Sequence, residues 1–139
     1  MNGYLVDTNV LSERRRRVPS PGVVAWLDDA PAGQLFMSVL TLGEIRYGVE
    51  LLTKRDPHSA ASIEAWLTDL VDRFTDRVLD VDQTVVTSWA RLRANRPVPV
   101  VDGLIAATAL AHDLTLVTRN TRDFVGLGLR LINPFQPTT

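Results

Sequence analysis

Apolar residues along the chain fall into two patterns, short continuous runs and longer stretches in which they recur every three or four positions. The short runs are rich in Leu, Val and Ile and predict buried strands. They lie at residues 3–7, 34–40, 77–81, 114–118 and 129–133. The recurring pattern is typical of helices with one buried face. It covers residues 22–29, 41–52, 62–74, 85–92 and 103–112.

The alternation of strands and helices predicts the fold class. Strands that are joined through helices pair in parallel, and helices then cover both faces of the sheet. A chain of 139 residues without a low-complexity linker is expected to form a single domain over residues 1–139. We therefore predict an α/β protein with a central parallel sheet of about five strands.

Four carboxylates follow the predicted strands closely. Asp7 ends the first strand, and Glu44 opens the helix after the second. Asp102 stands where the segment VPVVDG enters a helix of small residues, and Asp123 lies just past the fourth strand. Ligands of open α/β sheets bind beyond the carboxyl ends of the strands. We therefore expect these four side chains at the same edge of the sheet.

Three of these acids also fit a purely structural role at a helix start. Thr41 and Glu44 have the spacing of a capping box, in which the Glu side chain returns to the Thr backbone. Asp102 fits a simple N-cap, and Asn120 with Asp123 forms another cap-like pattern.

Asp7 is different, because the next helical pattern lies too far along the chain for this side chain to cap it. A hydrogen bond within a loop is its structural alternative. Four carboxylates in one cleft would repel one another unless a cation lay between them. Oxygen ligands alone favour Mg²⁺ or Mn²⁺ over zinc. Such sites typically act on phosphoryl groups.

Composition narrows the possible sites and partners. The chain has no cysteine, which excludes a thiolate metal site, and its histidines, His58 and His112, have no ligand spacing. The net charge of −1 gives no overall basic field for nucleic acid. We find no charged leader before an apolar segment and no apolar run near the roughly 18 residues of a membrane span. These features predict a cytoplasmic protein without a membrane partner.

The segments LVDTNVLSE, TLGEIRYGVELL and VVDGLIAATALAHDLTLVTRNTRDFVGLGLRLINPF resemble, in order and spacing, the PIN-domain nucleases. The similarity is greatest to toxins of the VapC type, including the FitB branch. It implies a three-layer α/β/α domain and a Mg²⁺- or Mn²⁺-dependent endoribonuclease that forms a homodimer. It also implies a cognate antitoxin, with a DNA-binding N-terminal part, that blocks the cleft.

The resemblance assigns roles to individual residues. Asp7 and Asp102 match the acids that hold the metal most directly, and Glu44 and Asp123 complete the catalytic quartet. Polar residues in the same segments match positions that support the acids: Thr8, Asn9, Thr118 and Asn120. The implied reaction is hydrolysis of an RNA phosphodiester by activated water, which leaves a 5′-phosphate and a 3′-hydroxyl.

Arginines close to these segments have two interpretations each. The run Arg14, Arg15, Arg16 and Arg17 is longer than the family's usual basic positions. It is expected either to contact RNA phosphates or the antitoxin, or to be a solvated surface. Arg46 and Arg119 are expected to pair with the acids.

Two other functions remain open at this stage. An aspartate-based phosphatase or phosphotransfer domain would use Asp7 as a nucleophile. Dehalogenase-like sites need a second Asp two residues later, where this chain has Asn9, and receiver domains need a lysine after a late strand, whereas Lys54 is the only lysine. A non-catalytic module that binds RNA or a partner is the other alternative, although binding alone does not need four acids in one cleft.

Overall fold

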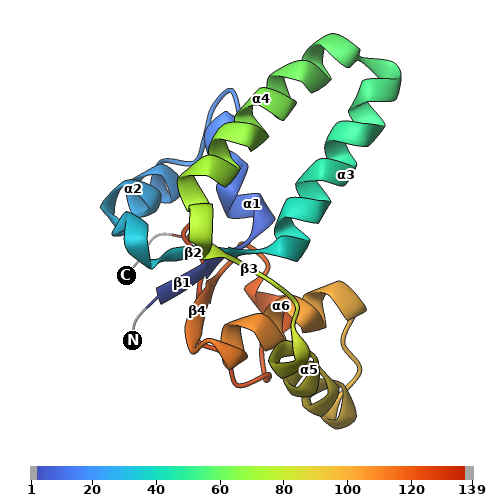
Figure 1. Ribbon diagram of the computed structural model, residues 1–139. Coiled ribbons are helices and arrows are strands. Elements are labelled where there is room, and N and C mark those ends of the chain that lie inside the picture. Colours follow the sequence, from blue (N-terminus) through green and yellow to red (C-terminus); the bar gives the residue numbers. More distant parts are fainter. Residues whose placement is uncertain (1–2, 137–139) are drawn as a thin grey trace.

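A five-stranded parallel sheet forms the centre of the protein, as expected (Figure 1). The computed structural model describes residues 3–136. The strands are ordered β3-β2-β1-β4-β5 across the sheet. Their bounds are β1 Gly3–Val6, β2 Leu35–Ser38, β3 Val78–Leu79, β4 Leu114–Val117 and β5 Leu131–Ile132. The central strand, β1, pairs with β4 along its whole length, from Gly3 with Leu114 to Val6 with Val117.

Helices join the strands and form the outer layers. The α-helices are α1 Thr8–Leu11, α2 Pro21–Asp29, α3 Val39–Arg55, α4 Pro57–Phe74, α5 Gln83–Asn95 and α6 Val100–Ala111. Four short 3₁₀ helices complete the described chain: η1 Glu13–Arg15, η2 Ala32–Gln34, η3 Thr75–Arg77 and η4 Thr121–Phe124. Among residues 3–136 no helix is long and apolar enough to cross a bilayer.

Two apolar cores lie on opposite faces of the sheet, which confirms the three-layer prediction. Leu5 and Leu116 belong to the core that contains residues of α5 and α6. Val6 and Val117 belong to the other core, with residues of α2, α3 and α4. Successive side chains of a strand point to opposite faces, so these neighbouring residues enter different cores. In Figure 1, α3 and α4 run together as a long arm on one side, and α5 packs beside α6 on the other.

The helices of the arm begin earlier than their apolar patterns predicted. Ser38 caps α3, because its hydroxyl accepts a 3.0 Å hydrogen bond from the Leu40 N–H. Asp56 ends α3 and caps α4, accepting a 3.1 Å bond from the Ser59 N–H. Only Asp56 therefore separates the two helices, since Pro57 already begins α4.

Candidate active site

Asp7 lies at the carboxyl end of β1 with only 9% of its surface exposed. Its Oδ1 accepts a 2.8 Å hydrogen bond from the Thr8 N–H, and its Oδ2 accepts one of 2.8 Å from the Thr118 hydroxyl. Asp7 is also the N-cap of α1. The prediction that Asp7 caps no helix was therefore wrong. The reason is that α1 is a single turn, too short to show an apolar period, and starts at the very next residue.

The segment after β4 is tied to the segment after β1. Thr118 is fully buried, and its hydroxyl, besides donating to Asp7, accepts a 3.1 Å bond from the Asn120 N–H. The Asn9 side-chain oxygen accepts a 3.1 Å bond from the Arg119 N–H. Thr118 and Asn9 thus hold the two strand ends together. Asn120 contributes through its backbone.

Glu44 lies in the second turn of α3 and faces the Asp7 segment. The Thr8 hydroxyl donates a 3.1 Å hydrogen bond to Glu44 Oε1. The predicted capping box of Thr41 and Glu44 was wrong, because Ser38 caps the helix and Thr41 is already buried inside it. Thr8 therefore links Asp7, through its backbone N–H, to Glu44, through its side chain.

Asp102 and Asp123 approach from the other side of the sheet edge. Asp102 is the third residue of α6 and is not its N-cap, since the helix begins at Val100 after Pro99. Asp123 is exposed in η4, where its N–H donates a 3.0 Å bond to the Asn120 carbonyl. The Asn120 side chain makes no capping bond to η4, so the cap-like spacing was misleading there.

Mutual repulsion connects the four acids. Partial burial raises the pKa of Glu44, and the charges of Asp7 and Asp102 raise it further, against the opposing effect of the Thr8 hydrogen bond. Burial also raises the pKa of Asp102, followed by the charges of Asp123 and Asp7. Each carboxylate is thus close enough to another for their charges to interact, as expected for four acids at the same edge of the sheet.

The donor set fits a hard divalent cation. All four side chains offer carboxylate oxygens, which Mg²⁺ and Mn²⁺ prefer. A bound cation would offset both the burial and the mutual repulsion that raise the pKa of Glu44 and Asp102. Across residues 3–136, no three His, Cys, Asp or Glu side chains form a compact metal-binding group. Asp7 and Asp102 are the residues that would hold a cation, and their assignment remains a prediction.

Comparison with known proteins shows the family of this chain. A family model for the PIN domain matches residues 4–127. This chain belongs to the PIN domain family. It is 35% identical to the toxin FitB of Neisseria gonorrhoeae, covering 94% of this chain and 97% of FitB. It is 34% identical to the VapC ribonuclease Y4jK of Sinorhizobium fredii, covering 96% of this chain and 98% of that protein.

A solved structure confirms the fold of this PIN domain. The crystal structure of FitAcB from Neisseria gonorrhoeae superposes with a TM-score of 0.90 at 34% sequence identity. The match covers 96% of this chain and 99% of that one. The three-layer architecture predicted from the apolar pattern is therefore the architecture of a known PIN domain.

A hollow of about 340 Å³ opens beside the acids of this PIN domain. We call it the Asp102 hollow, and its lining residues are Arg96, Pro97, Val98, Pro99, Asp102, Arg122 and Asp123. The Arg96 guanidinium donates a 3.3 Å bond to the Asp123 carbonyl. Sequence reasoning selected neither Arg96 nor Arg122. The only indication in the sequence is that Arg96 lies shortly before Asp102 and that Arg122 lies directly before Asp123.

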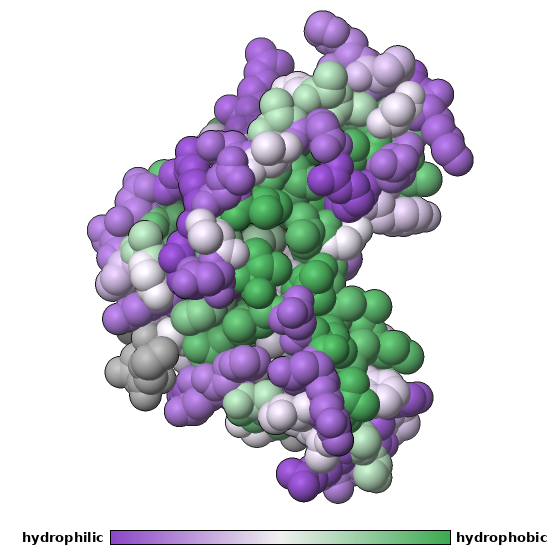
Figure 2. All heavy atoms as spheres, viewed as in Figure 1, coloured by the Kyte–Doolittle hydropathy of each residue, from purple (hydrophilic) through white to green (hydrophobic). Residues whose placement is uncertain are grey.

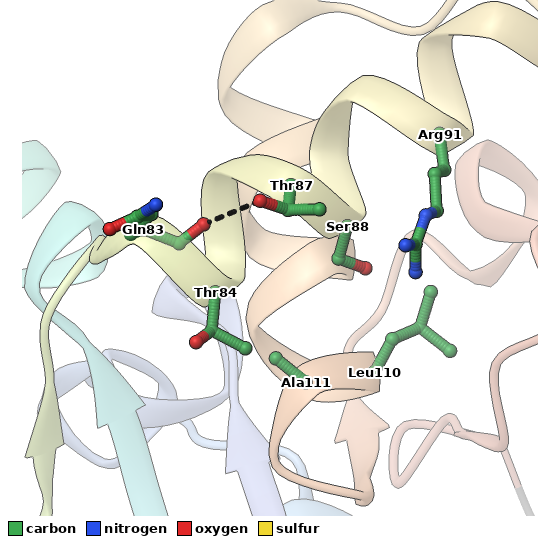
Figure 3. Close-up of a pocket in the computed structure, with 7 residues that line it drawn as sticks. All are labelled: Gln83, Thr84, Thr87, Ser88, Arg91, Leu110 and Ala111. Atoms are coloured by element: carbon green, nitrogen blue, oxygen red, sulfur yellow. Dashed lines mark hydrogen bonds between the residues drawn. The ribbon is translucent and has the colours of Figure 1, made fainter.

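A larger hollow, of about 520 Å³, lies between α5 and α6 and contains none of the predicted site residues (Figure 3). Figure 3 shows the hydroxyls of α5 and the Arg91 side chain around it, with the Thr87 hydroxyl bonded to the Gln83 carbonyl at 2.9 Å. Ala111, at the end of α6, lines this hollow, whereas Asp102 stands at the beginning of the same helix. The two hollows are therefore at opposite ends of α6.

The arginines singled out from the sequence contact other residues than the four acids. Arg14 pairs with Asp28, and the Arg15 guanidinium lies over the Trp66 ring, 5.0 Å from its centroid. Arg16 lies 3.7 Å from Glu13, and Arg17 is exposed. Much of the run is therefore held against α2 and α4.

The pairing expected for Arg46 and Arg119 was wrong. Arg46 pairs with Glu64 of α4, a helix that contains none of the four acids. The Arg119 guanidinium lies over the Phe135 ring, 4.8 Å from its centroid. Both histidines, His58 and His112, are exposed.

Proposed function

We propose that this PIN domain is the toxin of a toxin–antitoxin pair and an endoribonuclease that depends on Mg²⁺ or Mn²⁺. The observation that supports this most strongly is the gathering of Asp7, Glu44, Asp102 and Asp123 at one edge of the sheet, where burial and then their mutual charges raise the pKa of Glu44 and Asp102. Relatives over nearly the full length are named a toxin and a ribonuclease. An RNA substrate and a place in the cytoplasm are part of the proposal.

In the proposed reaction, the chain's own groups orient the carboxylates and accept a proton. Asp7 and Asp102 would hold the cation, whose chemistry is to neutralise phosphate oxygens and lower the pKa of water. Asp7 is fixed by its bonds from the Thr8 N–H and the Thr118 hydroxyl. Glu44 is suited to accept the proton of the attacking water, because its pKa is raised towards neutral pH. The products would carry a 5′-phosphate and a 3′-hydroxyl.

The proposed antitoxin requires a docking surface, and an apolar groove on the α2 and α4 side of the sheet suits it. The groove has a volume of about 360 Å³ and lies between α1, α2 and α4. Apolar side chains cover much of it, and arginines stand among them: Leu11, Leu27, Leu35, Trp66, Leu70 and Phe74, with Arg14, Arg73 and Arg77. An amphipathic segment with acidic residues on its polar face would complement both. A similar solved structure is that of a toxin–antitoxin complex from Klebsiella pneumoniae, which supports an antitoxin as the partner.

Exposed apolar residues support the proposed homodimer. Tyr47 and Leu51 of α3 are 65% and 48% exposed, and Val86, Val100 and Val101 of α5 and α6 are 41–51% exposed. Figure 2 shows apolar side chains gathered along the concave side of the molecule, between the arm and the α5–α6 layer. A second copy that covers this side would remove these groups from water.

The decisive test is the sequencing of cellular RNA ends after controlled expression of the wild-type protein and of Asp7→Asn. We expect new 5′-phosphate ends only with the wild type, and cleavage of the same RNA by purified protein only when Mg²⁺ or Mn²⁺ is added. Far-UV circular dichroism must show that the variant is folded. A 2′,3′-cyclic phosphate product, or equal cleavage by Asp7→Asn, would contradict the proposal.

A further inference from the structure

Two arginines share a hollow with two of the proposed catalytic acids. Arg96, at the end of α5, and Arg122, in η4, line the Asp102 hollow together with Asp102 and Asp123. Both arginines are exposed. A polyanionic substrate that approaches four carboxylates meets repulsion, and cationic side chains beside the acids would offset it.

Within residues 3–136, neither guanidinium forms an ion pair with an acid. The ion pairs within residues 3–136 involve other arginines, such as Arg46 with Glu64 and Arg130 with Asp113. Arg96 donates one bond, to the Asp123 carbonyl, and this carbonyl carries no net charge. A guanidinium has five N–H donors, so Arg96 keeps donors for a further acceptor. Both side chains are therefore able to bind an anion next to Asp102.

Another hollow adjoins the Asp102 hollow. It has a volume of about 390 Å³ and is lined by Arg119, Asn120, Thr121, Asn133 and Gln136, in addition to Arg122 and Asp123. Because both hollows contain Arg122 and Asp123, they adjoin at η4. Together the two adjoining hollows contain three arginines, Arg96, Arg119 and Arg122, and mostly polar side chains. This lining suits a chain of phosphates better than an apolar ligand.

We propose that Arg96 and Arg122 bind phosphates of the RNA strand next to the one that is cleaved, so that the strand runs from the acids through these adjoining hollows. The inference rests on the proposed ribonuclease function and extends it to the path of the substrate. Arginine suits this role because its planar fork matches two phosphate oxygens at once. The two residues bind substrate, and the four acids carry out the reaction.

The test measures RNA binding separately from cleavage. A fluorescent single-stranded RNA of mixed sequence is titrated with full-length Asp7→Asn protein in Mg²⁺, at several salt concentrations. Arg96→Gln and Arg122→Gln are each expected to weaken RNA binding about five- to tenfold. Each should also make the fall of the logarithm of the association constant with the logarithm of the salt concentration less steep, by about 0.7. Arg96→Lys keeps the charge and should keep most of the slope.

Arg91→Gln is the matched control, because it removes the same charge from the same helix but at the remote hollow between α5 and α6. Equal effects from Arg91→Gln, or unchanged affinity and slope in both Arg96→Gln and Arg122→Gln, would overturn the inference. The melting temperature of each variant shows whether Arg96 only holds η4 in place through the Asp123 carbonyl. A purely structural role would lower that temperature and leave the slope unchanged.

Cleavage by the otherwise wild-type protein is assayed in parallel to separate the two proposals. If the wild type cleaves RNA and the arginine variants bind as tightly as the control, the inference fails and the ribonuclease remains. If the wild type does not cleave but the arginine variants lose affinity, the ribonuclease proposal fails and the RNA path remains. Absence of RNA binding in the Asp7→Asn protein itself would overturn the inference.

Discussion

The Thr118 hydroxyl donates a 2.8 Å hydrogen bond to Asp7 Oδ2 and so joins two residues that are 111 positions apart in the chain. Both residues follow adjacent strands of the sheet, where Val6 of β1 is paired with Val117 of β4. The bond fixes the orientation of the carboxylate at the sheet edge. Together with the Thr8 N–H, it satisfies one acceptor on each Asp7 oxygen.

Replacing Thr118 by Val should weaken catalysis without removing an acid. Val has nearly the same shape but leaves Asp7 Oδ2 without its buried donor. We expect cleavage to fall about 10- to 100-fold, as for other groups that orient metal ligands. The free energy of unfolding should fall by about 1–3 kcal/mol. Thr118→Ser keeps the hydroxyl and is the control, and a fully active Val variant would show that this bond is dispensable.

The rate of cleavage should depend on pH through Glu44 and Asp102. The pKa of both is raised, so each carboxylate protonates at a higher pH than an ordinary Glu or Asp. Thr8→Val removes the hydrogen bond that lowers the pKa of Glu44, and the acid side of the pH–rate profile should then move to higher pH. Thr8→Ser should leave the profile in place. A shift of the Thr8→Val profile to lower pH would contradict this account.

Metal-free protein should become more stable when one of the repelling acids is neutralised. A carboxylate with a raised pKa binds protons more tightly in the folded state than in the unfolded state. Folding stability therefore falls as pH rises through the pKa values of Glu44 and Asp102. In chelator at pH 7, Glu44→Gln and Asp102→Asn should raise the melting temperature by about 1–2 °C, because solvent screens both groups.

Added Mg²⁺ should make the wild type more stable than these variants. A ligand that binds only the folded state stabilises it, and a variant that lacks a carboxylate binds the cation less well. The wild type should therefore gain more in melting temperature from Mg²⁺ than Asp102→Asn does. Differential scanning calorimetry at several Mg²⁺ concentrations measures both effects. An equal gain in the two proteins would argue against Asp102 as a ligand.

The close approach of α5 and α6 should make Gly103 sensitive to substitution. A Cβ at this position would lie 3.1 Å from Trp89 Cδ1 and 3.2 Å from Trp89 Nε1. Gly103→Ala should therefore separate the helices and lower stability by about 1–3 kcal/mol. Gly43→Ala in α3, where a Cβ meets nothing within 4 Å, should instead stabilise the protein by about 0.5–1 kcal/mol. Urea denaturation of both variants checks the opposite signs.

The sheet and its functional edge were predictable because they depend on local patterns. Each strand is a short apolar run, and each of the four acids lies within a few residues of a strand end or a helix start. The details at the edge depend on contacts between distant segments. The hydrogen bond from Thr8 to Glu44 spans 36 positions, and no local spacing indicates it. The local capping pattern of Thr41 and Glu44 predicted a different partner and was wrong.

Arg96 and Arg122 show a second limit of sequence reasoning. The conspicuous feature in the sequence is the run Arg14–Arg17, yet Arg14 pairs with Asp28 and Arg15 covers Trp66. Arg96 and Arg122 are isolated in the sequence and meet at one hollow only because α5 and η4 end at the same side of the sheet. A cluster of charges in a folded protein need not be a cluster in its sequence.

The pairing of β1 with β4 also affects when activity can first arise during translation. β1 leaves the ribosome before its partner, residues Leu114–Val117, has been synthesised. Until β4 and η4 have been synthesised, a nascent chain contains neither the donor to Asp7 nor Asp123. The proposed nuclease centre therefore forms only after η4 has been synthesised, and a chain that stops before η4 is expected not to cut RNA.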